Sequence, residues 1–288
     1  MRVLITGGCG FIGSNLAEEL SKRYDVVVLD DLSSGSLKNI EGLDVEFIKG
    51  SITDLDLLKR VFRDVDCVLH QAAIVSVQES IENPVRVNEV NVGGTLNVLI
   101  AARDTGVEKV VNASSCAVYG DASELPLKED AKTNPKSPYA VTKLIGEHYC
   151  KVFSEVYGLK TVSLRYFNVY GPKQDHTSDY AAVIPKFITR VIRGKPPIIY
   201  GDGKQTRDFI FVKDVVLANL LALESKAEGV FNIATGKATS IEELAFLVTD
   251  ILGKDLEIKY DKPRKGDIRH SLGDISKARE VLGFEPKY

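Results

Sequence analysis

Tyr139 and Lys143 have the residue types and the spacing of a proton-transfer pair, within the segment SPYAVTKLIGEHY. A helix places residues i and i+4 on one face, so the two side chains are expected about one turn apart. A free tyrosine has a pKa of about 10 and is protonated at neutral pH. We expect Lys143 and a bound cationic ring to lower the pKa of Tyr139 by about 3 units, which requires about 4 kcal/mol. Tyr139 would then serve as general acid and base.

A Tyr and a Lys at this spacing also occur on many solvated helices, so their neighbours must decide between the two interpretations. Ser114 and Ser115 end an apolar run from Lys109 to Ser115, which predicts a strand. Ligands bind at the carboxyl ends of parallel strands. One of the two hydroxyls is therefore expected to hydrogen-bond the substrate oxygen that Tyr139 deprotonates.

A glycine-rich turn predicts a nucleotide site near the N-terminus. In TGGCGFIG, Gly7, Gly10 and Gly13 follow a predicted strand and enter a helix, whose N-terminus favours a pyrophosphate. The next strand ends in Asp30 and Asp31, where a carboxylate can accept the adenosine ribose hydroxyls. Two carboxylates with no nearby arginine favour NAD over NADP. A purely structural turn beside a surface acid is the alternative.

The elements that carry these residues alternate between short β-branched runs and segments of helical period. This predicts an α/β fold with a Rossmann, doubly wound parallel sheet of six or seven strands over residues 1–170. Residues 171–288 are expected to form mainly a smaller C-terminal α/β substrate lobe. A buried run at 230–234 predicts a return strand to the large sheet.

Composition excludes several classes of protein. The net charge of −3 and the absence of Trp argue against a nucleic-acid partner. No apolar run approaches the length of a membrane span, and the four cysteines show no CxxC spacing, which favours a reducing cytoplasm. The four histidines are dispersed, so no metal site is expected.

The motifs together resemble the extended short-chain dehydrogenase/reductase family, and within it the UDP-glucose 4-epimerases. The resemblance rests on TGGCGFIG, the DD after the second strand, HQAA, NVGGT, SSCAVYG, YxxxK and LRYFNVYGP, and it covers nearly the whole chain. It implies that Ser115 is the catalytic serine, Tyr139 the acid and base, and Lys143 the residue that binds the nicotinamide ribose. The implied cofactor contacts are Gly7, Gly10, Phe11, Ile12, Gly13, Asp30, Asp31, Ser34, Gly35, Ser51, Ile52, Gln71, Ala72, Ala73, Asn91, Ser114, Tyr139, Lys143 and Tyr166.

The same resemblance implies a UDP-sugar site in the smaller lobe. Tyr200 would face the uracil, Arg207 and Arg264 would bind the diphosphate from two sides, and Asp267 would hold a ribose hydroxyl. The implied substrate contacts are Ser76, Ser115, Tyr139, Asn168, Ala182, Val183, Lys186, Tyr200, Gln205, Arg207, Arg264, Asp267 and Ser271.

Several positions depart from the family pattern. Relatives that dehydrate or decarboxylate nucleotide sugars carry acidic residues where this chain has Cys116 and Ala117, so simple epimerisation is favoured. Ser51 occupies the place of an Asp that faces the adenine in many relatives. Ser271 is small where some relatives hold an aromatic residue, so an N-acetyl group at C2 is an open alternative.

The sequence thus predicts an NAD-dependent isomerase that epimerises a UDP-hexose at C4 through a transient 4-keto sugar. The alternatives are a 4,6-dehydratase or reductase of the same family, and a non-catalytic protein that binds NAD and a nucleotide sugar. The resemblance also implies a homodimer, built from predicted helices near 84–104 and 138–157.

Overall fold

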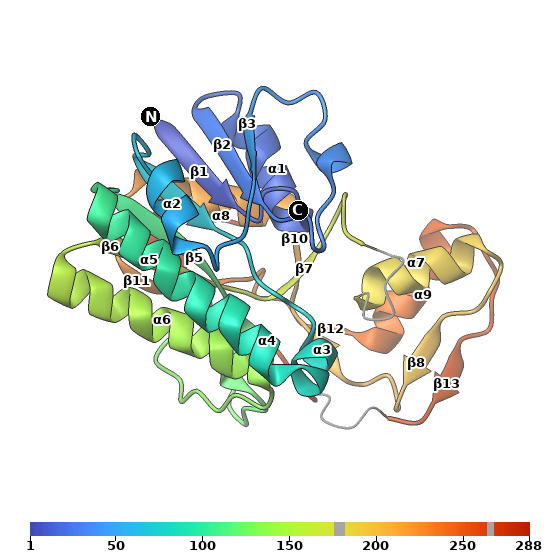
Figure 1. The fold of residues 1–288 in the computed structure, drawn as a ribbon. Coiled ribbons are helices and arrows are strands. Elements are labelled where there is room, and N and C mark those ends of the chain that lie inside the picture. Colours follow the sequence, from blue (N-terminus) through green and yellow to red (C-terminus); the bar gives the residue numbers. More distant parts are fainter. Residues whose placement is uncertain (176–181, 264–267) are drawn as a thin grey trace.

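A seven-stranded sheet forms the centre of the larger part of the molecule, with strand order β11-β6-β5-β4-β1-β2-β3 and every neighbouring pair parallel (Figure 1). The computed structural model describes residues 1–175, 182–263 and 268–288. The strands of this sheet are β1 (Arg2–Thr6), β2 (Asp25–Asp30), β3 (Glu46–Lys49), β4 (Cys67–His70), β5 (Lys109–Ser115), β6 (Lys160–Tyr166) and β11 (Gly229–Ile233). The predicted doubly wound α/β fold is confirmed.

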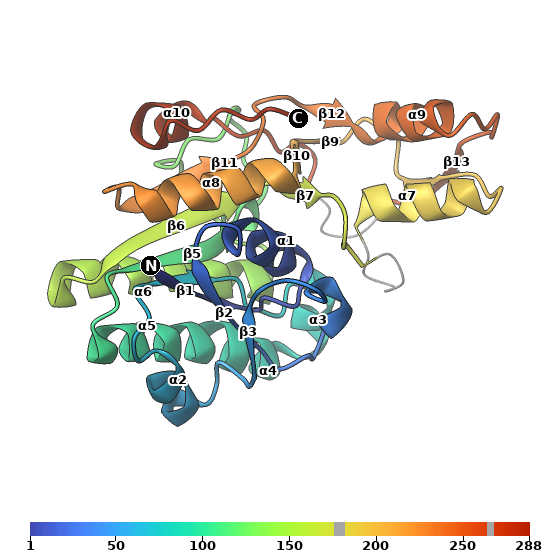
Figure 2. The same ribbon diagram turned by 90° about the horizontal axis from the view of Figure 1, so that it is seen from above.

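Helices cover both faces of this sheet (Figure 2). One face carries α1 (Phe11–Leu20), α8 (Val212–Glu224) and α10 (Ser276–Leu282). The other carries α2 (Leu55–Val61), α5 (Gly94–Thr105) and α6 (Pro138–Tyr157). Neighbouring residues of β1 alternate between the two cores, with Val3 and Ile5 in one and Leu4 in the other. Burial on both faces explains why these strands appear in the sequence as continuous apolar runs.

The helix expected from about Pro84 is present and runs on to Thr105, but it contains a π-helical turn and a short separate helix precedes it. Between β4 and α5, the chain forms α3 (Val77–Glu82), α4 (Pro84–Asn88) and a π-helical turn (Glu89–Gly93) before α5 begins. Asn91 lies in that turn, and its amide binds both backbone groups of Ile74, at 2.8 and 2.9 Å. This long-range contact joins the π-turn to the loop after β4.

The smaller part contains α7 (Val183–Ile192), β8 (Ile198–Tyr200), α9 (Ile241–Ile251) and β13 (Lys259–Asp261), which lie together at the right of Figure 1. They share a separate apolar core that includes Phe187, Ile199 and Leu244. Short strand pairs lie in the connecting region. These are β7 (Asn168–Tyr170) with β10 (Phe209–Phe211), and β9 (Thr206–Arg207) with β12 (Thr239–Ser240).

After first leaving the sheet near residue 170, the chain returns to the larger part. α8 packs against α1, and β11 pairs in parallel with β6, with Val230 opposite Ser163. α10 also packs on this side, against α8 and β11. Residues 212–233 and 276–282 therefore belong spatially with the parallel sheet, and the two parts of the molecule interleave in the sequence.

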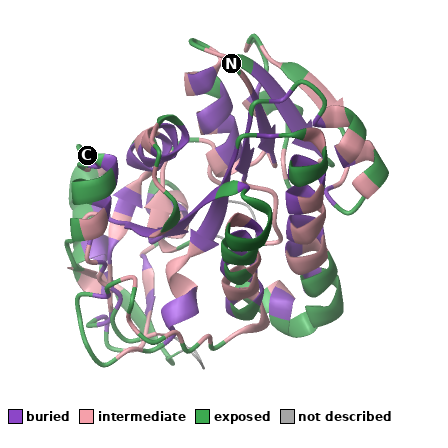
Figure 3. Cartoon of the chain, turned by 90° about the vertical axis from the view of Figure 1, so that its left-hand side faces the viewer, coloured by how far each residue is buried: buried purple, intermediate pink, exposed green. Residues whose placement is uncertain are grey.

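The strand order reverses at β1, which has β2 on one side and β4 on the other. Ligands of doubly wound sheets bind beyond the carboxyl ends of the strands at such a reversal. The inner strands are buried, the edge strand β3 is partly exposed, and the outward sides of the surrounding helices are exposed (Figure 3). Within the described ranges, no helix is both long enough and apolar enough to cross a membrane.

Candidate active site

The glycine turn between β1 and α1 is too tightly packed for side chains at two of its positions. Gly7 has a φ of 70°, and a Cβ there would lie 2.7 Å from the Ala72 Cα. A Cβ on Gly13 would lie 2.1 Å from the Gly7 carbonyl oxygen. Gly10 is the N-cap of α1, and among the described residues no side chain caps the first backbone N–H groups of the helix, those of Phe11 and Ile12 included. This is the geometry that a bound pyrophosphate requires.

Asp30 lies at the end of β2 beside this turn and is only 7% exposed. Its two carboxylate oxygens accept from the Cys9 N–H at 2.9 Å and the Leu32 N–H at 2.8 Å. Burial raises the pKa of Asp30, against the lowering effect of these two hydrogen bonds. Each oxygen retains a further acceptor position, which suits a ribose diol. Asp31 is exposed and accepts from the Ser33 N–H.

Other predicted cofactor residues lie around this turn. A Cβ on Gly35 would meet the Cys9 backbone at 2.8 Å, so the loop that carries Ser34 packs directly on the turn. Ser51 follows β3, and its hydroxyl lies 3.0 Å from that of Thr53. Ile52 is buried.

The loop after β4 is held in place by a buried amide network. The Ala72 N–H donates to the Thr6 hydroxyl at 3.4 Å, and Ala73 is half-buried. Gln71 Nε2 donates to the Tyr166 hydroxyl at 3.1 Å and to Asn219 Oδ1 at 3.3 Å. Gln71 and Tyr166 are therefore brought together, as expected of residues that line one site. Asn219 on α8 completes this network.

Ser115, Tyr139 and Lys143 converge at the carboxyl end of β5. Ser137 caps α6 by accepting from the Ala140 N–H at 3.2 Å, which places Tyr139 in the first turn. The Tyr139 phenol lies close enough to the Ser115 side chain for the serine to lower the pKa of the phenol. Lys143 Nζ lies 6.0 Å from the centre of the Tyr139 ring and donates to the Ala113 carbonyl at 2.8 Å.

The ionisation of this pair differs from the expectation. Burial raises the pKa of Tyr139 to about 12, although its hydrogen bond with Ser115 lowers it. Burial also lowers the pKa of Lys143 to about 8. The protein groups alone therefore do not depress the pKa of Tyr139, because the low-polarity surroundings penalise the phenolate more than the Ser115 hydroxyl stabilises it. A bound cationic ring would have to supply the remaining stabilisation.

The two serines at the end of β5 have different surroundings. Ser114 is 3% exposed, and its hydroxyl donates to the Glu147 carboxylate. Ser115 caps the short 3₁₀ helix Cys116–Tyr119 by accepting from the Ala117 N–H at 3.2 Å. The residue pattern alone does not decide which of the two hydroxyls faces the substrate oxygen. The hydroxyl of Ser115 is the one beside Tyr139.

Two predicted substrate residues hold buried oxygens that have no hydrogen-bond partner within the described residues: Asn168 Oδ1 and Gln205 Oε1. Asn168 begins β7, and Gln205 Nε2 donates to the Tyr200 carbonyl at 2.8 Å. Arg207 lies on β9 and donates to the Thr206 carbonyl, besides further contacts. A buried polar atom without a hydrogen-bond partner costs free energy. Such atoms are typical of positions that meet a polar ligand.

Ser271 lies next to the catalytic end of β5. It is 6% exposed, and its side chain is in hydrogen-bonding contact with Cys116. Burial raises the pKa of the Cys116 thiol to about 11, so this thiol stays protonated at neutral pH. Ser271 and Cys116 therefore form a small, uncharged part of the site beside Tyr139.

The remaining predicted substrate residues are more scattered. Ser76 caps α3 by accepting from the Glu79 N–H at 3.0 Å. Ala182, Val183 and Lys186 lie at the start of α7, where the Lys186 N–H donates to the Ala182 carbonyl. Tyr200 lies at the end of β8. Arg264 and Asp267 lie outside the described residues.

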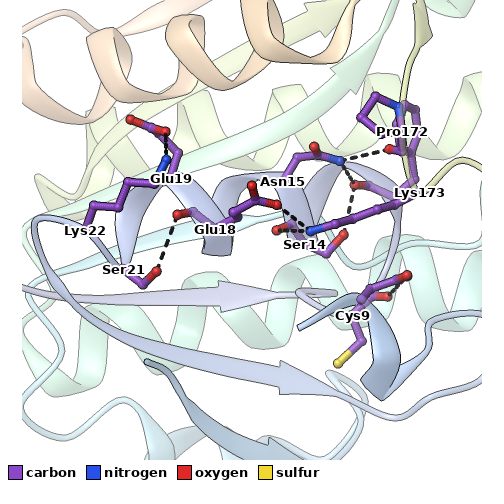
Figure 4. Close-up of polar contacts among 11 residues, drawn as sticks. Cys9, Ser14, Asn15, Glu18, Glu19, Ser21, Lys22, Pro172 and Lys173 are labelled. Carbon is purple, nitrogen blue, oxygen red and sulfur yellow. Dashed lines mark hydrogen bonds and ion pairs between the residues drawn. The ribbon is translucent and has the colours of Figure 1, made fainter. Parts of the chain in front are cut away.

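Side chains from α1 fasten the segment after β7 to the larger part (Figure 4). Asn15 Nδ2 donates to the carbonyls of Phe11 and Pro172, at 2.9 and 3.2 Å. Lys173, with a φ of 69°, forms an ion pair of 2.7 Å with Glu18. These contacts hold the segment beside the first turns of α1.

One positioning group near the site was missed by sequence reasoning. Asp208 is fully buried, and its carboxylate accepts from the backbone N–H groups of Thr235, Gly236 and Gly273. It thereby joins the end of β9 to the loop after β11 and to the segment of Ser271. The sequence offers one signal, the position of Asp208 directly after Arg207, but it does not reveal partners that distant.

Comparison with known proteins agrees with this geometry. Residues 3–234 match the model of the NAD dependent epimerase/dehydratase family, and the chain belongs to that family. A putative UDP-glucose 4-epimerase of Methanocaldococcus jannaschii is 45% identical over 99% of this chain and 93% of its own length.

Two solved structures extend the likeness to the fold. A UDP-N-acetylglucosamine 4-epimerase from Methanobrevibacter ruminantium, in complex with UDP-N-acetylmuramic acid, superposes with a TM-score of 0.97 at 45% identity, over 99% of this chain and 93% of that one. A Thermus thermophilus UDP-glucose 4-epimerase in complex with NAD gives 0.92 at 42% identity, over 100% and 94%. The expected family and NAD dependence are thus confirmed.

Proposed function

We propose that this protein is an isomerase that interconverts the C4 epimers of a UDP-hexose, UDP-glucose and UDP-galactose or their N-acetylated forms. The carrying observation is the contact between Ser115 and Tyr139, with Lys143 one helical turn further along α6. The M. jannaschii, M. ruminantium and T. thermophilus relatives, all described as 4-epimerases, support this choice within the family.

In the proposed reaction, Tyr139 takes the proton of the sugar 4-hydroxyl and later returns it. Ser115 hydrogen-bonds the same oxygen and holds it beside the phenol. Lys143 binds a ribose hydroxyl and contributes positive charge near Tyr139. When bound, NAD would supply hydride acceptance from C4 and hydride return to the opposite face of the same carbon. Between these two transfers the 4-keto sugar would rotate to present its other face while its diphosphate stays bound.

The glycine turn fits NAD because it brings backbone N–H groups and Asp30 to one place, at the end of the sheet where the strand order reverses. Asp30 would hold the adenosine ribose and Asp31 would disfavour a 2′-phosphate. Gln71, Asn91 and Tyr166 would line or position the nicotinamide end. The other predicted cofactor contacts keep the roles assigned above as proposals, except Ser114, whose hydroxyl already donates to Glu147.

The UDP group would lie between the catalytic residues and the smaller part. The unpartnered oxygens of Asn168 and Gln205 would accept from the ligand or its bound water, and Arg207 would bind the diphosphate. Tyr200 and the start of α7 would face the uracil. Arg264 and Asp267 remain proposals from the sequence alone.

Cys116 and Ala117 favour epimerisation over dehydration. Loss of water from a 4-keto sugar needs further groups that remove and donate protons. The Cys116 thiol has a raised pKa and contacts Ser271, and Ala117 has no titratable group. The small Ser271 side chain leaves N-acetylated substrates among the proposed ones.

We also propose a cytoplasmic homodimer that serves galactose metabolism. α6 presents exposed apolar side chains, among them Val152 and Val156, at 45% and 66% exposure. α5 packs beside α6 on the same side of the sheet. The two helices could pair with the same helices of a second copy.

Tyr139→Phe tests the proposed role of the phenol. This variant should lower kcat for UDP-glucose epimerisation by about 10²- to 10⁴-fold, because the acid and base is lost. Its bound NAD content should stay unchanged, since the ring and helix remain. Product separation by chromatography measures the rate. Tyr157→Phe, at the exposed end of α6, is the matched control and should retain full activity. Normal turnover by Tyr139→Phe would contradict the mechanism.

A further inference from the structure

A buried ion pair lies one helical turn beyond Lys143. Glu147 on α6 and Arg165 on β6 each have side chains only 5% exposed. Arg165 Nε donates to Glu147 Oε1 at 2.9 Å, and its Nη2 donates to Oε2 at 2.7 Å. This two-pronged geometry fixes the orientation of both side chains.

The same pair also holds the strand that carries the catalytic serine. The Ser114 hydroxyl donates to Glu147 Oε1, and Ser114 lies opposite Arg165 in the register of β5 and β6. Arg165 Nη1 donates to the Glu129 carbonyl at 3.1 Å, and the guanidinium lies 4.6 Å from the centre of the Tyr119 ring. The pair therefore joins α6, β5, β6 and the chain at residues 119 and 129.

Helix α6 and the end of β5 are consequently linked at two adjacent residues of the strand. Lys143 Nζ donates to the Ala113 carbonyl, and Ser114 donates to Glu147. Ser115 is the next residue of the chain. These two links determine where the Ser115 hydroxyl lies relative to Tyr139.

Stability alone is a weak reason for such a pair. Replacing a buried ion pair by apolar residues of similar size is often neutral or stabilising, because burying two charges is costly. A shift of about 1 Å between reacting groups can reduce a rate by about 100-fold. A rigid, fully hydrogen-bonded pair next to the catalytic residues is therefore better explained by a role in holding these residues at the right spacing than by a gain in stability.

We propose that Glu147, Arg165 and Ser114 are positioning residues that set the spacing between Ser115 on β5 and Tyr139 and Lys143 on α6. The inference rests on the proposed epimerase function. It assigns these three residues no contact with substrate or NAD. Their loss should therefore lower kcat with little effect on KM or on the amount of NAD bound.

The first experiment measures kcat, KM, NAD content and Tm for Ser114→Ala and Glu147→Gln. Ser114→Ala removes one link and leaves the ion pair, so kcat should fall about 3- to 10-fold; Glu147→Gln should lower it by about 10- to 100-fold. KM should stay within about twofold for both variants. Lys109→Met is the control: Lys109 is a buried cation at the other end of β5, bound to the Ala222 carbonyl at 3.0 Å. It should leave kcat unchanged, whatever its effect on Tm.

A second variant separates positioning from stability. The triple variant combines Ser114→Ala, Glu147→Leu and Arg165→Met. It leaves no charge or hydrogen-bond donor of the network unpaired, so its Tm should lie close to the wild-type value. We expect kcat to stay at least about tenfold low, because the links between β5 and α6 are gone. Recovery of kcat together with Tm would overturn the proposal, as would normal kcat in both Ser114→Ala and Glu147→Gln. Those two variants decide the matter even if the triple variant does not fold. A wild-type enzyme without epimerase activity would instead contradict the proposed function itself.

Discussion

At the scale of single residues, the candidate site combines a phenol that is hard to ionise with an ammonium that is easy to deprotonate. Burial raises the pKa of Tyr139 to about 12 and lowers that of Lys143 to about 8. Both shifts have the same cause, the loss of water around a charge. The folded protein therefore keeps Lys143 charged at neutral pH only at a cost in stability.

Lys143→Met should stabilise the NAD-free protein at pH 7 while abolishing epimerisation. The pKa of Lys143 falls from 10.5 to about 8 on folding, which corresponds to about 3 kcal/mol. The lost hydrogen bond to Ala113 offsets part of this, so we expect a net gain of about 1 to 2 kcal/mol. Thermal unfolding measures it.

The pH dependence of this gain has a defined sign. Between pH 8 and 10.5 the unfolded wild-type chain binds a proton at Lys143 that the folded chain has released, so wild-type stability rises with pH in that window. The advantage of Lys143→Met should be complete below pH 8 and shrink above it. Lys151→Met, at a 70% exposed position of the same helix, should show no such trend. A variant less stable than the wild type at pH 7 would refute this account of Lys143.

The proposed catalytic residues could be picked out from the sequence because their signals are local. Tyr139 and Lys143 are four apart on one helix, and Ser115 ends an apolar run. Asn219 carries no such signal, and the position of Asp208 beside Arg207 does not reveal its partners, because both residues contact groups far away in the chain; Asn219 contacts Gln71, 148 residues away. The raised pKa of Tyr139 was equally hidden, because burial is a property of the folded chain.

At the scale of elements, the turn between β1 and α1 depends on close backbone approach. A Cβ on Gly13 would lie only 2.1 Å from the Gly7 carbonyl oxygen, which is too close for two atoms that are not bonded. Relief would require α1 to move away from β1, which would displace the predicted pyrophosphate contact. The turn thus fixes the position of α1 against β1 and also provides the proposed binding surface.

Gly13→Ala should therefore reduce both NAD content and Tm. Gly93→Ala is the matched control, because Gly93 has helical backbone angles and a Cβ there meets nothing within 4 Å. The control should leave NAD content unchanged and stability equal or up to about 1 kcal/mol higher. Absorbance of the NAD released on denaturation, together with thermal unfolding, gives both quantities. Equal NAD content and Tm in the two variants would show that the turn tolerates a side chain.

The long parallel strands were predictable because burial on both faces requires apolar runs. The π-helical turn at Glu89–Gly93 was not. It contains Asn91, whose contact with Ile74 across the loop is not revealed by the helical period of the sequence. β9 and β12, with two residues each, are too short for periodicity to reveal.

At the scale of the whole molecule, the chain crosses between its two parts more than once. The larger part supplies Ser115 on β5, Tyr139 on α6 and the glycine turn, while Asn168 and Arg207 lie on the short strands that connect it to the smaller part. The buried carboxylate of Asp208 joins the end of β9 to the loop after β11 and to the segment that carries Ser271. This arrangement supports a nucleotide sugar bound between the parts, with its C4 beside Tyr139.

The central claim is reversible oxidation at C4 with retention of the same hydrogen. The most direct measurement incubates the purified enzyme with UDP-glucose deuterated at C4 and identifies the products by chromatography and mass spectrometry. We expect UDP-galactose that keeps its deuterium at C4, without net formation of NADH. A product lighter by one water, loss of the deuterium to solvent, or no C4 epimer from either UDP-glucose or UDP-N-acetylglucosamine would contradict the account.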